Sequence, residues 1–242
     1  SIRRQRQMCI RDSRKLDRFV VLTKADKEDW EKVRPDVEQI YNPLTFVSDE
    51  VSPLTGKRCV AVGRLEAQKN FKDLIKAWKT VDGRHPDWTL SIFGKGSQEN
   101  ELRNLIKDSG LAGKVILEGG TSDIRKELLD SSCLVMSSRY EGFPMVLLEA
   151  LTTGLPIVSY DCPKGPSEIV TIGANGYLAK VGDTGTLAQG ICSVIANEDL
   201  RRRFGAESKR RSENFTLEKT MERWDRLFSS LTTSRTRTSP EG

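Results

Sequence analysis

Two glutamates flank a short stretch in which the chain changes from an open loop to a helix. Glu141 and Glu149 stand on either side of Gly142, Phe143, Pro144, Met145 and Val146. Pro144 suits the first position of a helix, and Gly142 keeps the entry loop open. Glu149 would then lie in the second turn with its side chain leaning back toward the helix start. Because a helix N-terminus attracts anions, the stretch could bind a phosphate and hydroxyl groups together.

A plainer interpretation of the same stretch remains open. Glu141 would be a capping-type acid, and Glu149 would be a solvated helix residue.

Two cations follow an apolar run that ends in Gly63. Arg64 offers a planar fork of donors and Lys69 a point charge, a combination suited to a diphosphate. The alternative is a solvated surface loop.

A second glycine-rich turn, Gly94-Lys95-Gly96, follows the next apolar run. Its glycines would let the backbone approach a phosphate or a sugar. The dinucleotide-binding fingerprint is incomplete, because Glu99 stands where a third Gly or Ala is needed. A dehydrogenase-type domain is therefore disfavoured.

The run Asp161-Cys162-Pro163-Lys164-Gly165 leads into another helix start. Glu168 would fall in the first turn of that helix, where an acid favours the dipole, so its role is expected to be structural. Asp161 and Lys164 stay open.

The elements that carry these loops alternate between short apolar runs and helical patterns from residue 58 onward. This rhythm predicts an α/β fold with a doubly wound, Rossmann-like parallel sheet. Ligands of such sheets bind at the carboxyl ends of the strands, where the loops above lie. The expected strands are Cys59–Val62, Leu90–Phe93, Val115–Leu117, Leu134–Met136 and Pro156–Tyr160, and the late helices are Thr186–Ala196, Leu200–Ser212 and Leu217–Phe228.

Composition shifts divide the chain into five parts. We expect a disordered head that does not look native (1–13), the closing elements of a preceding domain (14–43) and a linker (44–57). A sheet domain with C-terminal helices (58–228) and a disordered tail (229–242) complete the chain.

Composition also excludes several classes of function. The net charge is +5, but residues 1–13 contribute +3 and residues 229–242 contribute +1, so nucleic-acid binding is not indicated. His85 is the only histidine, which leaves little for a catalytic triad or a metal site. No apolar run is long enough for a membrane span, and we expect a cytoplasmic protein. No two cysteines stand at metal-binding spacing, so reduced structural thiols are expected at Cys9, Cys59, Cys133, Cys162 and Cys192.

Four motifs together resemble the C-terminal, donor-binding domain of family 4 glycosyltransferases, and the likeness covers roughly residues 16–228. The motifs are Gly63-Arg64-Leu65 with Lys69-Asn70-Phe71, Glu141-x7-Glu149 around Gly142-Phe143-Pro144, the run from Gly154-Leu155-Pro156 into Gly165-Pro166-Ser167-Glu168, and Asn175-Gly176-Tyr177-Leu178.

The resemblance implies the C-terminal half of a GT-B enzyme that transfers a sugar from a nucleotide donor with retention and without a required metal or other cofactor. Residues 14–43 would then be a remnant of its N-terminal acceptor domain, and residues 58–228 would be its nucleotide-sugar-binding domain. By the same carry-over, Arg64 and Lys69 neutralise the departing diphosphate and Glu141 contacts the donor sugar, which makes these three the expected catalytic residues. Glu149 contacts the ribose. The remaining expected donor-binding residues are Gly63, Gly94, Gly96, Gly142, Phe143, Pro144, Met145 and Val146.

The form at 161–169 looks most like enzymes of bacterial surface polysaccharide assembly. It implies a UDP-hexose or UDP-N-acetylhexosamine donor and a glycan or lipid-linked acceptor. It also implies that the full-length parent associates peripherally with the inner face of the membrane. Since most of a first domain is missing, a second hypothesis is a nucleotide-sugar-binding module without turnover. Phosphorylase and epimerase activities are disfavoured by the absence of a pyridoxal-anchoring context and of histidines.

Overall fold

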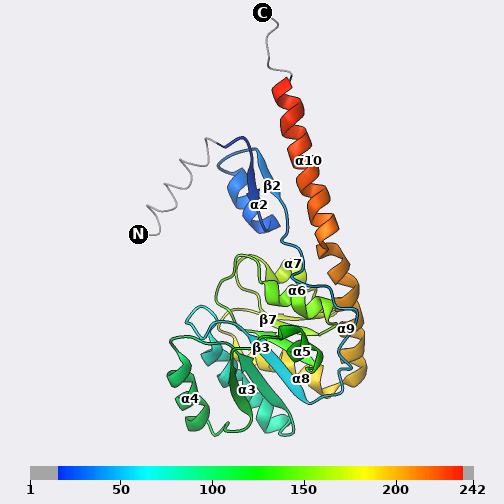
Figure 1. The fold of residues 1–242 in the computed structure, drawn as a ribbon. Coiled ribbons are helices and arrows are strands. Elements are labelled where there is room, and N and C mark those ends of the chain that lie inside the picture. Colours follow the sequence, from blue (N-terminus) through cyan, green and yellow to red (C-terminus); the bar gives the residue numbers. More distant parts are fainter. Residues whose placement is uncertain (1–15, 237–242) are drawn as a thin grey trace, which may run out of the picture. The chain divides into compact units, whose positions relative to one another are not determined.

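The computed structural model describes residues 16–236, which form two compact units (Figure 1). The larger unit spans residues 44–213. The smaller unit combines the described residues up to Pro43 with those from Asn214 onward. The predicted head (1–13) and the end of the predicted tail (237–242) lie outside the described residues.

The larger unit contains a six-stranded sheet in which every strand pair is parallel. Its order is β5-β4-β3-β6-β7-β8, so the strand order reverses between β3 and β6. This is the order of a doubly wound nucleotide-binding sheet, and the predicted fold class is confirmed. The strands are β3 (Arg58–Val62), β4 (Thr89–Phe93), β5 (Val115–Gly119), β6 (Cys133–Met136), β7 (Ile157–Tyr160) and β8 (Gly176–Ala179).

Helices cover both faces of this sheet (Figure 1). Because parallel crossovers are right-handed, helices that lead toward β5 and those that lead toward β8 lie on opposite faces. Helix α8 packs against α3, and α9 packs against α6. The helices are α3 (Phe71–Arg84), α4 (Glu99–Asp108), α5 (Ile124–Leu129), α6 (Met145–Thr152), α7 (Pro166–Ile169), α8 (Thr184–Ala196) and α9 (Glu198–Ser212).

The core lies between the sheet and these helices. Strands β6 and β7 are buried along their whole length, as expected of central strands covered on both faces. Trp78 of α3 and Phe204 of α9 are fully buried. Strand β8 was not predicted as a strand, although its residues belong to the last of the four motifs.

A buried cation, Arg201 of α9, closes the end of α8. Its side chain is 6% exposed and donates to the backbone oxygens of Ile195 (2.6 Å), Val194 (3.3 Å) and Leu54 (3.2 Å). The last carbonyls of a helix have no partner within it and carry partial negative charge. Arg201 therefore supplies hydrogen-bond donors to these carbonyls and a positive charge that offsets their partial negative charge.

The segment 44–57 is not a linker, and this prediction is wrong. The backbone N–H of Ser48 donates to Oγ1 of Thr152 (3.0 Å), and that of Ser52 donates to the oxygen of Thr153 (2.9 Å). Leu54 is 5% exposed. The polar composition misled the prediction, because the backbone N–H groups of Ser48 and Ser52 bond to the end of α6.

The smaller unit is built from β1 (Phe19–Val21), α2 (Lys24–Glu31), β2 (Val37–Gln39) and α10 (Leu217–Thr236), with a short 3-10 turn at Glu213–Phe215 leading into α10. Strands β1 and β2 are parallel. Within this unit, the ring of Phe19 lies 4.4 Å from that of Trp30, and Arg223 donates to Oε1 of Gln39 at 3.1 Å.

Two predicted boundaries therefore change. Helix α10 belongs with residues 16–43 rather than with the sheet domain predicted over 58–228. It also continues to Thr236, so the prediction of disorder is wrong for residues 229–236. Ser230 and Thr232 bond to carbonyls one turn back, which lets polar residues extend a helix without burying apolar surface.

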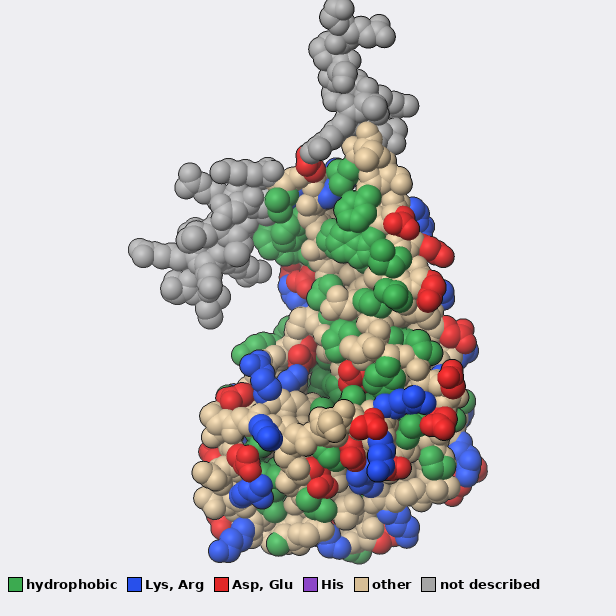
Figure 2. Space-filling model, viewed as in Figure 1, with side chains coloured by type: hydrophobic (Ala, Val, Ile, Leu, Met, Phe, Trp, Pro, Cys, Tyr) green, Lys and Arg blue, Asp and Glu red, His purple; other side chains and the backbone are tan. Residues whose placement is uncertain are grey.

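One side of α10 carries exposed apolar side chains. Leu217, Met221 and Phe228 are 56%, 46% and 55% exposed, and Figure 2 shows hydrophobic side chains at the surface over this helix. Leu227 of the same helix is buried, so α10 is only partly covered.

Candidate functional site

An ion pair joins the loops that follow β3 and β6. Nζ of Lys69 lies 2.6 Å from Oε1 of Glu141, and the two side chains are only 19% and 9% exposed. These strands are neighbours at the point where the strand order reverses. In open α/β sheets, this reversal point is where ligands bind. The structure thus brings together two of the three residues predicted to be catalytic.

Hydrogen bonds to backbone oxygens hold the two loops together. The N–H of Arg139 donates to the oxygen of Gln68 (2.9 Å), and Nε2 of Gln68 donates back to the oxygen of Tyr140 (2.9 Å). Oγ of Ser137 donates to the oxygen of Lys69 (2.9 Å). The positions of Lys69 and Glu141 are therefore set by the loops themselves and not only by the attraction of their charges.

A third loop, which follows β7, reaches the same place. Cys162 is 2% exposed, and burial, together with the nearby charge of Glu141, raises the pKa of its thiol to about 12. A neutral buried thiol is a poor nucleophile, in agreement with the structural role predicted for the cysteines. A Cβ on Gly165 would lie 2.5 Å from Cδ of Pro144, so this loop passes directly against the start of α6.

The loop after β7 also carries unusual backbone. Lys164 has a φ of 69°, and Gly165 has a φ of 121°. The left-handed region is costly for a lysine, and such residues persist where the surrounding structure holds them.

Arg64, the other predicted cation, is exposed. Across residues 16–236 its guanidinium has no recorded hydrogen bond or ion pair, whereas Lys69 is bound to Glu141. Its nearest recorded electrostatic partner is Glu66. Bonds from the backbone and hydroxyl of Ser97 lower the pKa of the Glu66 carboxyl, and Arg64 contributes to this shift.

The glycines of the first two loops allow one backbone to lie against the other. A Cβ on Gly94 would lie 1.9 Å from the oxygen of Gly63, and one on Gly96 would lie 2.5 Å from the oxygen of Leu65. The N–H of Leu65 donates to the oxygen of Lys95 at 3.0 Å. This packing explains why Gly94 and Gly96 carry no side chain, and it fixes the loop from which Arg64 projects. A Cβ on Gly63 would instead lie 3.0 Å from the side chain of Lys69.

Helix α6 begins one residue later than predicted. Pro144 has an extended ψ of 95° and stands before the first helical residue, Met145. Pro144 itself provides no side-chain cap for this N-terminus. The carboxylate of Glu141 is paired with Lys69, and its interpretation as a capping-type acid stays open. Of the predicted donor-binding residues here, Phe143 and Pro144 are buried, Met145 and Val146 are half-buried, and Gly142 is exposed.

Glu149 lies in the second turn of α6, as predicted, but it is not a freely solvated residue. It is half-buried, and burial raises the pKa of its carboxyl, an effect that a hydrogen bond from Thr45 partly opposes. Oγ1 of Thr45 lies 2.9 Å from Oε1 of Glu149. Thr45 was not singled out from the sequence, since a threonine in a polar segment has no pattern that marks such a contact.

Two further observations concern metal binding and membrane-spanning helices. Within residues 16–236, no group of three or more His, Cys, Asp or Glu side chains is placed to hold a metal ion. No helix in the same range is both long and apolar enough to cross a membrane.

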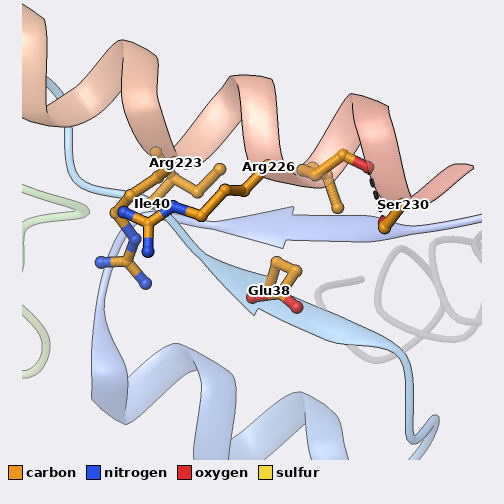
Figure 3. A pocket seen from close by; sticks show the side chains of 6 residues that line it. Glu38, Ile40, Arg223, Arg226 and Ser230 are labelled. Atoms are coloured by element: carbon orange, nitrogen blue, oxygen red, sulfur yellow. Dashed lines mark hydrogen bonds between the residues drawn. The ribbon is translucent and has the colours of Figure 1, made fainter.

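A separate cavity of about 280 Å³ lies inside the smaller unit, between β2 and α10 (Figure 3). Glu38 points into it from β2, while Arg223, Arg226 and Ser230 come from α10. Arg226 donates to the oxygen of Glu222 at 3.1 Å. None of these residues was singled out from the sequence.

Comparison with known proteins places this arrangement in a wider group. Residues 46–211 match the family described as glycosyl transferases group 1. An uncharacterized glycosyltransferase of Haemophilus influenzae is 33% identical over 211 residues, covering 86% of this chain and 60% of the relative. The poly(ribitol-phosphate) alpha-N-acetylglucosaminyltransferase of Staphylococcus aureus is 28% identical and covers 95% of this chain and 47% of its own length.

A solved structure shares the fold. TarM of S. aureus, in complex with fondaparinux, alpha-GlcNAc-glycerol and UDP, superposes with a TM-score of 0.85 at 26% identity, covering 93% of this chain and 46% of that one. The chain thus spans about half the length of these relatives.

Proposed function

This chain belongs to the group 1 glycosyl transferases, and on that premise we propose that it forms the nucleotide-sugar-binding half of a retaining, family 4 glycosyltransferase. The observation that carries the proposal is the ion pair of Lys69 and Glu141 at the reversal point of the sheet. The start of α6, which follows Pro144, belongs to the same group of loops. Together they offer a cation, a carboxylate and a helix N-terminus at the edge where such sheets bind nucleotides.

In the proposed reaction, the bond between the anomeric carbon and the diphosphate oxygen breaks. The acceptor hydroxyl forms a new bond to that carbon on the same face of the sugar and passes its proton to the departing diphosphate. Negative charge develops on the departing diphosphate, and preorganised donors aimed at such charge are often the largest catalytic contribution. Arg64 and Lys69 supply these donors. Lys69 can do so while paired, because an ammonium has three N–H groups and Glu141 accepts one.

The carboxylates recognise hydroxyl groups in this proposal. Glu141 accepts hydrogen bonds from the donor sugar, and Glu149 accepts them from the ribose. The backbone from Phe143 to Val146 meets the phosphates at the start of α6, with Gly142 leaving room for the sugar. Gly63, Gly94 and Gly96 shape the loops on the other side of the donor.

A UDP-hexose or UDP-N-acetylhexosamine is the proposed donor, and a glycan or lipid-linked glycan of surface polysaccharide assembly is the proposed acceptor. Similarity to TarM bound to UDP supports the uridine nucleotide. Similarity to a transferase named for poly(ribitol-phosphate) supports a polymer acceptor. We further propose that transfer needs no metal, which predicts unchanged donor binding in EDTA, and that the enzyme works in the cytoplasm, including at the inner face of the membrane.

The alternative, a nucleotide-sugar-binding module without turnover, is not favoured, because the named relatives are transferases. A transfer assay separates the two. Release of UDP that depends on an added glycan acceptor supports the transferase, whereas binding without such release supports the module.

Calorimetric titration of the full chain with UDP, GDP and ADP tests the donor site. We expect one nucleotide to bind, and we expect Arg64→Ala and Glu149→Ala each to weaken its binding about tenfold, the effect of losing one hydrogen bond to a charged group. Arg103→Ala is the matched control, since Arg103 lies on the surface of α4 paired with Glu99. A folded wild-type protein that binds none of the three nucleotides would contradict the proposal.

A further inference from the structure

The segment 44–57 is attached to the C-terminal half of α6. Besides the bonds of Ser48 and Ser52 to Thr152 and Thr153, Nζ of Lys209 donates to the oxygen of Thr152 at 3.1 Å and also to that of Ser48. The segment is thus held between α6 and α9. Thr45 lies at its start, opposite Glu149.

Thr45 is the only side chain in residues 16–236 with a recorded hydrogen bond to the Glu149 carboxylate, and no ion pair of Glu149 is recorded there. A half-buried carboxylate loses hydration, so a hydroxyl donor stabilises its charged form and limits its orientations. The two residues are separated by 104 positions in the chain. Only the packing of the segment on α6 brings them together.

Most of the charged groups on neighbouring elements are engaged elsewhere. On α9, Lys209 and Arg211 donate to backbone oxygens of Ser48, Thr152 and Ile169. On α5, Arg125 pairs with Glu50 and Glu127 pairs with Arg58. Lys126, also on α5, has no recorded pair within the described residues. The acid of α7 is Glu168. None of these groups is among the causes of the Glu149 pKa shift.

We propose that Thr45 is a positioning residue that holds the Glu149 carboxylate in the orientation required to accept hydrogen bonds from the ribose of the donor. The contact itself is seen in the structure, and its consequence for ribose recognition rests on the proposed function. Thr45 would thereby set how strongly the site prefers a ribonucleotide to its 2′-deoxy form. The segment that contains it is then part of the donor site.

The test compares binding of UDP and 2′-deoxy-UDP to the full chain. Thr45→Val should weaken UDP binding about threefold to tenfold, the worth of one hydrogen bond, and should reduce the preference for UDP over 2′-deoxy-UDP. Thr45→Ser keeps the hydroxyl and should restore both. Thr171→Val is the matched control, because Thr171 is an exposed threonine of the same unit whose hydroxyl has no recorded bond.

A double-mutant cycle separates positioning from general damage to the fold. In the Glu149→Ala background, Thr45→Val should cause no further loss of UDP binding. An equal loss in both backgrounds, or an unchanged preference for UDP in Thr45→Val, would overturn the inference.

Titration of the Glu149 carboxyl by NMR gives a readout that needs no nucleotide. Thr45→Val should raise the pKa of Glu149 and Thr45→Ser should leave it unchanged, since the lost hydroxyl stabilised the ionised form. An unchanged pKa in Thr45→Val would overturn the inference even if the donor site exists. Failure of the wild type to bind UDP, by contrast, would count against the proposed function while this titration still decides the role of Thr45.

Discussion

Lys69 and Glu141 are separated by 72 positions in the chain, yet their side chains meet at 2.6 Å. Each lies in the loop after its strand, and those two strands are neighbours in the sheet although β4 and β5 come between them in the sequence. The pair therefore forms because the chain first adds β4 and β5 on one side of β3 and then returns to add β6 on the other side. The bond to Glu141 orients the ammonium of Lys69 at the edge of the sheet where we propose that the diphosphate binds.

The first prediction concerns the stability of this pair. Lys69→Met leaves the Glu141 carboxylate poorly solvated and without its partner, and we expect it to lower the free energy of unfolding by about 1–3 kcal/mol. Adding Glu141→Gln should recover part of the loss. Urea denaturation measures both effects. Arg103→Met, which breaks an exposed pair with Glu99, should cost less than about 0.5 kcal/mol. An equal loss of stability in the two variants would contradict the idea that burial strengthens the Lys69–Glu141 pair.

The second prediction concerns the contact between the first two loops. Gly96→Ala places a Cβ against the backbone of Leu65 and should destabilise the protein by about 1–3 kcal/mol. The displaced loop carries Arg64, so nucleotide binding should weaken as well. Gly83→Ala is the control, because it lies within α3 with nothing near its added Cβ, and it should stabilise the protein by about 0.5–1 kcal/mol. Thermal unfolding of the two variants should shift in opposite directions.

The third prediction concerns pH and Glu149. Burial raises the pKa of this carboxyl in the folded state, so the folded protein still holds the proton at a pH where the unfolded chain has released it. The contribution of protonated Glu149 to stability is fully present below the pKa of this carboxyl in the unfolded chain. It is lost as the pH rises through the pKa of the carboxyl in the folded protein. Glu149→Gln should therefore be more stable than the wild type at pH 7, by less than about 1 kcal/mol, while binding donor less well.

Unfolding curves recorded from pH 4 to pH 7 test this dependence. The difference between wild type and Glu149→Gln should shrink toward the acid end. A difference that stays constant across the range would show that ionisation of Glu149 is not its cause.

The fourth prediction concerns Arg201 at the end of α8. Arg201→Met leaves the carbonyls of Val194, Ile195 and Leu54 without their donor, and we expect a loss of about 2 kcal/mol or more in the free energy of unfolding. The neighbouring Arg202→Met removes only an exposed pair with Glu198 and should cost about 0.3–0.5 kcal/mol. Denaturation of the two variants under the same conditions makes the comparison, and similar losses would count against the capping role of Arg201.

Agreement between sequence and structure is closest where local patterns carry the information. All five predicted strands of the sheet were found, because their apolar runs and the helical spacing between them follow from short stretches of chain. Predictions at boundaries fared worse. The segment 44–57 looked like a linker and residues 229–236 looked disordered, since polar composition says little about what a backbone will bond to.

The candidate site divides in the same way. The residue types and spacing at Arg64, Lys69, Glu141 and Glu149 determined which groups we propose for binding a phosphate and hydroxyl groups. Tertiary structure alone decided that Lys69 pairs with Glu141, that Arg64 stays at the surface and that Thr45 bonds to Glu149. The physical reason is that such contacts join positions far apart in the chain. They depend on strand order and on how loops pack, which no local pattern of residues records.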